Sequence, residues 1–155
     1  MEKGFYEVPF VEDALMNLVF PEGQKIDGQT FLHGECGIFA LALHDTYGYD
    51  LGWLLDDDEE NESDNPWHHL VHVFCITNVD GEDDPVYIDV RGCQTNESRF
   101  EDPFEDFFVE PNYVYGVSYE TIRDNIWMEM SKEEYDTFYK AAKLFIEQCK
   151  EFYKP

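Results

Sequence analysis

The stretch from residue 33 to residue 44, HGECGIFALALH, is the feature that most constrains how this chain can fold. A glycine and an acidic residue interrupt any apolar pattern at its start, and an unbroken run of small and apolar residues follows over residues 38–43. This change predicts a buried helix that begins near Glu35 or Cys36. The rest of the chain must then supply the layers that cover that helix.

Cys36 lies in the first turn of the predicted helix. Unpaired backbone N–H groups and the helix dipole favour negative charge at this end, so we expect the Cys36 thiol to ionise more readily than a free thiol. Such a thiol is a candidate nucleophile. The alternative is that Cys36 only packs, because free cysteine is among the most buried residue types. The neighbouring Glu35 carboxylate also opposes thiolate formation.

Two downstream segments carry a candidate functional residue inside an apolar, β-branched run. Residues 67–77 (WHHLVHVFCIT) contain His72, and residues 85–92 (PVYIDVRG) contain Asp89. Both runs predict strands, and the acidic segment between them, with an Asp-Gly step at 80–81, predicts a turn. Antiparallel neighbours joined in this way would present His72 and Asp89 side by side.

Together these residues provide a nucleophile, Cys36, a general base, His72, and an orienting carboxylate, Asp89. The alternative is that the three residues are unrelated. Asp89 argues against it, because a carboxylate in a strand flanked by valine and isoleucine needs a partner. Arg91, two residues along on the same face, is a second candidate for that partner.

A cysteine that heads a buried helix, followed by histidine and aspartate on consecutive strands, resembles the papain-like Cys-His-Asp superfamily in its compact, transglutaminase-like arrangement. Arylamine N-acetyltransferases and small peptidoglycan-cleaving cysteine peptidases share this order. The HGECGIFALAL, HVFCI and YIDVRG segments are also similar to small uncharacterised bacterial and phage proteins with a Cys-helix, an HV-strand and a D-x-R-G strand. The resemblance covers residues 31–92 and implies catalytic roles for Cys36, His72 and Asp89.

Papain-like enzymes also use a glutamine a few residues before the cysteine as an oxyanion donor. That resemblance makes Gln29 a candidate for the same role. The alternative is that Gln29 is an exposed loop amide and that the backbone N–H of Cys36 serves as the donor.

The pattern of the remaining segments predicts an α+β fold with a papain-like or transglutaminase-like core, in a single domain of residues 1–155. We expect N-terminal helices, a central antiparallel sheet and a long C-terminal helix. The predicted helices cover residues 11–20 and 131–153, the further strands cover 51–55 and 113–119, and the phenylalanines between 100 and 108 form one amphipathic turn.

Length and composition agree with one stable domain. A chain of 155 residues can bury a continuous core, and 43% hydrophobic with 17% aromatic residues argues against general disorder. The four cysteines form no C-x-x-C pair, which suits reduced thiols. With no membrane-spanning apolar stretch and no signal-like N-terminus, we expect a cytoplasmic protein that does not bind a membrane.

Four residues of metal-ligand type lie close together in the sequence, namely His68, His69, His72 and Cys75. Alternation along a strand would turn 68 and 72 away from 69 and 75, so these residues could not converge on one ion. We therefore expect no metal and no cofactor.

The net charge of −25 affects which kinds of partner the protein can bind. Direct nucleic-acid binding is not expected, because it requires basic residues that release counterions. An acidic surface can instead imitate nucleic acid and bind a basic protein, although a simply solvated surface explains the charge too.

The sequence therefore predicts a thiol-dependent hydrolase or acyl transferase that acts on a peptide, amide or ester through a thioester. This class includes cysteine peptidases, amidases and transglutaminase-like acyl transferases. The alternative is an acidic binding or inhibitor protein, such as a phage-type nucleic-acid mimic that blocks a basic nucleic-acid-binding enzyme.

Overall fold

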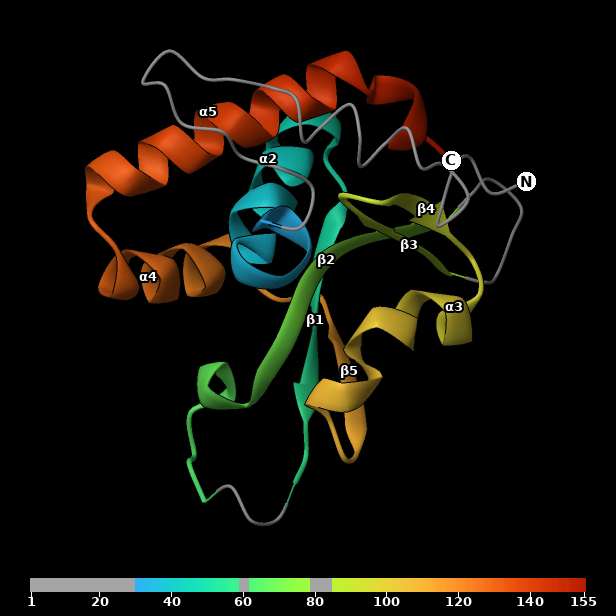
Figure 1. Ribbon diagram of the computed structural model, residues 1–155, viewed down its shortest axis with the longest axis vertical. Coiled ribbons are helices and arrows are strands. Elements are labelled where there is room, and N and C mark those ends of the chain that lie inside the picture. The colour runs from blue at the N-terminus through green and yellow to red at the C-terminus, as the bar shows by residue number, and fades with distance from the viewer. Residues whose placement is uncertain (1–29, 59–61, 79–84) are drawn as a thin grey trace.

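The computed structural model describes residues 30–58, 62–78 and 85–155, and within them the fold is α+β. Five strands form one antiparallel sheet in the order β4-β3-β2-β1-β5 (Figure 1). The strands are β1 (Asp50–Asp56), β2 (Leu70–Asn78), β3 (Pro85–Asp89), β4 (Gly92–Gln94) and β5 (Pro111–Tyr115).

Helices cover both faces of this sheet. They are the π-helical turn η1 (Thr30–Gly34), α2 (Cys36–Tyr47), η2 (Pro66–His69), α3 (Glu97–Glu101), η3 (Asp102–Phe107), α4 (Tyr119–Glu129), α5 (Lys132–Gln148) and η4 (Lys150–Phe152). Helix α2 packs on β2 and is itself covered by α5 and α4, whereas α3 and η3 lie against the other side of the sheet (Figure 1). None of the described helices is long and apolar enough to cross a membrane.

Helix α2 is the centre of the core, and the prediction of a buried helix from Glu35 or Cys36 is confirmed. Every residue from 36 to 43 is buried, because the helix is apolar on all sides and lies between the sheet and α5. It ends at Gly48, whose φ of 78° is the left-handed conformation that glycine adopts without strain.

The long C-terminal helix is confirmed, with a shorter extent than 131–153. Ser131 caps it by accepting the Glu134 N–H at 3.1 Å, and the Ser131 hydroxyl donates to the Glu134 carboxylate at 3.2 Å. Helix α5 ends at Gln148, and the chain then turns so that the buried Tyr153 hydroxyl donates to the Val90 carbonyl at 2.9 Å. The C-terminal segment is therefore tied to the turn between β3 and β4.

Several predicted boundaries were wrong for local reasons. The strand at 67–77 starts only at Leu70, because Asn65 caps the short helix η2 before it. The strand at 113–119 lies instead at Pro111–Tyr115, and Ser118 then caps α4, a helix that the sequence pattern did not predict. The predicted helix at 11–20 and the turn at 80–81 lie outside the described residues.

Candidate active site

His72 and Asp89 are in direct contact, as the strand pattern predicts. Strands β2 and β3 pair with Cys75 opposite Ile88. If this antiparallel register is continued by one residue, Asp89 lies opposite Phe74. His72 precedes Phe74 by two residues and therefore points to the same face of the sheet. The His72 Nε2 atom lies 2.9 Å from Asp89 Oδ2. Because an ionised carboxylate only accepts, Nε2 donates, and Nδ1 is then the basic nitrogen of the neutral imidazole.

Arg91 also binds Asp89, so the two partners considered from the sequence are both present. Its Nη2 lies 2.6 Å from Asp89 Oδ2, and its backbone N–H donates to Oδ1 at 2.9 Å. Burial would raise the pKa of Asp89, but the Arg91 charge and the hydrogen bonds from His72 and Arg91 outweigh it and hold that pKa well below its usual range. Asp89 is therefore ionised at neutral pH within a buried network.

Aromatic rings close over this network and form what we call the aromatic enclosure, made of Phe74, Phe100 and Phe104. The Phe104 ring stacks on the fully buried His72 imidazole with 4.2 Å between centroids. The Arg91 guanidinium lies 5.0 Å from the Phe100 centroid and 5.3 Å from that of Phe104. Helices α3 and η3 thus fix the imidazole from the face of the sheet opposite α2.

Cys36 meets the same strand from the other side. Its Sγ accepts the Val73 N–H at 3.3 Å, and this amide is available because the β2–β3 pairing stops at Cys75. Cys36 is therefore next to the residue that follows His72. In the described part of the chain, no hydrogen bond joins the thiol directly to the imidazole.

The expectation of an easily ionised Cys36 was wrong. Burial, together with smaller contributions from the Glu35 and Asp89 charges, raises the pKa of the Cys36 thiol to about 11. Hydrogen bonds from the Val73 and Gly37 N–H groups act in the opposite direction, as expected at a helix start, but they are outweighed. The thiol is thus protonated at neutral pH.

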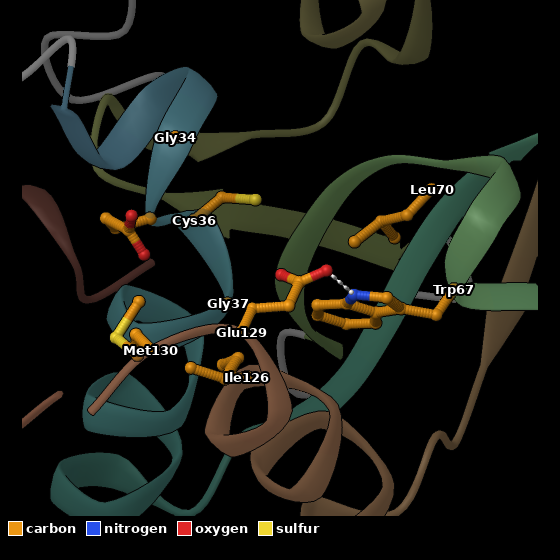
Figure 2. A pocket seen from close by; sticks show the side chains of 9 residues that line it. Gly34, Cys36, Gly37, Trp67, Leu70, Ile126, Glu129 and Met130 are labelled. Carbon is orange, nitrogen blue, oxygen red and sulfur yellow. Dashed lines mark hydrogen bonds between the residues drawn. The ribbon is translucent and has the colours of Figure 1, made fainter. Parts of the chain in front are cut away.

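A pocket of about 180 Å³ opens beside Cys36 between the start of α2, the end of α4 and η2 (Figure 2). Glu129 on α4 accepts the Trp67 indole N–H at 2.9 Å across it. The lining residues are Gly34, Glu35, Cys36, Gly37, Trp67, Leu70, Ile126, Glu129 and Met130. The sequence pattern did not predict this pocket because it did not predict α4. The sequence signals for this helix were Ser118 as its N-cap and the apolar Ile122 and Ile126, which are four residues apart.

The residues of metal-ligand type that the sequence analysis rejected as a site make other contacts. Ring nitrogens of His68 and His69 approach Ser63 at 2.6 Å, and the Cys75 thiol donates to the Ala40 carbonyl at 3.2 Å. Among the described residues, no group of three or more His, Cys, Asp or Glu side chains could hold a metal ion. Gln29, the oxyanion candidate, lies outside the described residues.

Comparisons with protein-family models, curated proteins and solved structures find no match to this chain. The papain-like and transglutaminase-like resemblance therefore stays a prediction, and the function must be argued from the site itself.

Proposed function

We propose that this protein is a thiol-dependent hydrolase or acyl transferase that uses Cys36 as its nucleophile on an amide or ester. The observation that carries the proposal is a pocket opening on Cys36, whose sulfur contacts β2, the strand that carries His72 and pairs with the strand of Asp89. A thiol that lines a cavity, bound to the amide of the residue that follows an oriented imidazole, supplies the nucleophile and the base that acyl chemistry requires.

In this proposal substrate binding draws the thiol off the Val73 amide and past the strand edge that is left open where the β2–β3 pairing stops at Cys75, so that His72 Nδ1 takes its proton. The sulfur forms a bond to the acyl carbon, and the carbonyl π electrons move to oxygen, where N–H groups at the start of α2 stabilise them. The tetrahedral intermediate expels the amine or alcohol, which takes the proton from His72 and leaves a thioester. Water or an amine, deprotonated by His72, then attacks that thioester and releases the product with a restored thiol.

The pKa of about 11 for Cys36 distinguishes two modes of activation. In the first mode, a preformed thiolate–imidazolium pair, the thiol is already ionised at neutral pH. In the second mode, the thiol stays protonated until attack; with a pKa of about 11, roughly one thiol in 10,000 is ionised at pH 7. General-base deprotonation during attack is therefore the mode we propose. Iodoacetamide labelling of Cys36 should rise about tenfold per pH unit from pH 7 to 10 without a neutral plateau, and such a plateau would establish the ion pair instead.

Acyl transfer to the protein tests the proposal directly. Intact-mass spectrometry after incubation with small p-nitrophenyl esters should detect one acyl group, mapped to Cys36 and absent from Cys36→Ala. Cys75→Ala is the matched control, because Cys75 is equally buried but faces Ala40 rather than the pocket. Acylation or turnover that persists in Cys36→Ala at the wild-type rate would refute the mechanism.

A second candidate function, an acidic surface for a basic protein, has its own support. The Asp56 carboxylate accepts the N–H groups of Val109 and Glu110 at 3.0 Å, which joins the acidic segment after β1 to the one before β5. Exposed acidic residues gather at this end of the sheet, namely Asp57, Glu62, Asp64, Asp102, Glu105, Asp106 and Glu110. The exposed Phe107 and Val109 lie in the same region and would add apolar contact.

Salt dependence tests this second function. The protein should displace labelled duplex DNA from basic nucleic-acid-binding enzymes at about 50 mM salt and lose most of this effect at about 500 mM. Cys36→Ala should bind as wild type does. An absence of displacement at low salt across a panel of such enzymes would count decisively against the surface.

A further inference from the structure

We infer that the pocket beside Cys36 accepts a positively charged group, and that the substrate carries a lysine- or arginine-like side chain next to the acyl carbon. That the ligand is a substrate rests on the proposed function, whereas the preference for a cation rests on the residues that line the pocket. The inference thus names the substrate class that the proposed enzyme would select.

Two of the residues that line this pocket, Glu35 and Glu129, carry carboxylates. Within the described residues, neither Glu35 nor Glu129 forms an ion pair. Burial raises the pKa of the half-buried Glu35, and the charges of Glu129 and Glu134 raise it further, so these carboxylates repel one another. A cation bound at Glu129 would offset that repulsion.

The carboxylate of the exposed Glu129 is oriented by one hydrogen bond. The Trp67 indole N–H donates to one of its carboxylate oxygens at 2.9 Å, which leaves the other oxygen able to accept from a ligand (Figure 2). A carboxylate oriented by a tryptophan is a fixed recognition group, in contrast to the solvated acidic residues of the loops.

The rest of the lining suits a hydrocarbon stem. Trp67, Leu70, Ile126 and Met130 supply apolar walls, and the indole face can also attract a cation. Lysine and arginine side chains place their methylene groups on such surfaces and extend their charged heads to polar groups. An anionic group would be repelled, and a neutral apolar group would leave both carboxylates unpaired.

The size of the pocket restricts what enters it. Its volume of about 180 Å³ exceeds the roughly 150 Å³ of a cavity that binds benzene, and it is smaller than the roughly 300 Å³ at which drug-sized sites begin. One side chain therefore fits, and the remainder of the substrate stays outside. Because Cys36 lines the same pocket, that side chain belongs to the residue beside the attacked carbonyl.

Charged thiol reagents test the cation preference without requiring turnover. We would measure labelling of Cys36 in the full chain by 2-aminoethyl, 2-sulfonatoethyl and methyl methanethiosulfonate, each rate divided by that of free glutathione. Glu129→Gln removes the charge but keeps an acceptor for Trp67. Glu133→Gln is the matched control, because it removes the same charge from an exposed position outside the pocket.

We expect Cys36 to prefer the cationic over the anionic reagent, and Glu129→Gln to reduce that ratio about fivefold, the size of one partly exposed ion pair. Glu133→Gln should change it less than twofold. Equal rates for the two reagents, or equal changes in the two variants, would overturn the inference.

Substrates then separate the inference from the proposed function. Fluorogenic peptidyl amides with lysine or its uncharged isostere norleucine before the cleaved bond should differ in kcat/KM, and Glu129→Gln should narrow the difference about fivefold. Cleavage with equal kcat/KM for the two residues would refute the inference and leave the proposed enzyme intact. If no amide or ester is cleaved while labelling still depends on Glu129, the proposed enzyme fails and the cation-binding pocket stands.

Discussion

The pocket beside Cys36 and the aromatic enclosure of His72 treat negative charge in opposite ways. In the enclosure, one buried carboxylate, Asp89, binds both an imidazole and a guanidinium. In the pocket, Glu35 and Glu129 are partly exposed and have no basic partner among the described residues. The charge in the enclosure is therefore fully paired, so that its removal would leave buried groups without a partner, whereas the pocket keeps its charge available for a ligand.

Removal of the Asp89 charge should produce the largest loss of stability. Asp89→Asn would leave the Arg91 guanidinium buried without its carboxylate, and breaking a buried pair in this way costs about 3–5 kcal/mol. The free energy of unfolding in urea would measure the loss. The matched control is Asp124→Asn, whose ion pair with Arg123 is exposed and should contribute less than about 1 kcal/mol. Equal effects of the two variants would show that the enclosure is not a stabilising network.

The next largest effect should come from the ring that covers His72. Phe104→Ala removes a side chain that is 1% exposed and should destabilise the protein by about 3 kcal/mol, because a buried phenylalanine leaves a cavity. Phe107→Ala, on the same short helix but 61% exposed, should cost less than about 0.5 kcal/mol. Comparable losses would mean that η3 does not close the enclosure as a packed unit.

Acid should weaken the enclosure with a defined sign. Because the pKa of Asp89 is lowered in the folded protein, its stabilisation is fully present above the unfolded pKa of about 3.9 and is lost as pH falls toward the folded pKa. Below pH 3.9 the unfolded state alone binds this proton, so the loss is about 1.4 kcal/mol per pH unit. The stability gap between wild type and Asp89→Asn should narrow by about 1 kcal/mol from pH 5 to pH 3. A constant gap would mean that Asp89 titrates alike in both states.

Local patterns were sufficient to predict the pieces of the site. The start of α2 follows from the change in composition at Cys36, and the His72–Asp89 contact follows from period-two alternation on two strands joined by a short connection. The start of α2 and the His72–Asp89 contact both depend on residues that are close together in the sequence. The charge network needs no distant element to bring its residues together.

Properties that depend on distant segments could not be predicted in this way. The pKa of Cys36 is dominated by burial under elements far along the chain, so the helix start gave the wrong direction. The pocket needs Trp67 from a helix expected to be strand and Glu129 from a helix not expected at all. Phe100 and Phe104 were expected to lie in one amphipathic turn, but their contact with His72 depends on the turn after β4.

The smallest effect on stability should come from the pocket, and it carries the sharpest information about charge. Glu129→Gln changes an exposed residue and should alter the free energy of unfolding by less than about 0.5 kcal/mol. It should nevertheless lower the pKa of Glu35, because the Glu129 charge is one of the causes that raise it. Carbon-13 NMR of the Glu35 carboxyl would detect the change, with Glu133→Gln as the control. An alkylammonium ion added to wild type should shift this pKa in the same direction, since a cation in the pocket offsets the same repulsion. If Glu35 responds to the substitution but not to the ion, its carboxylate repels Glu129 without forming a site for a cation.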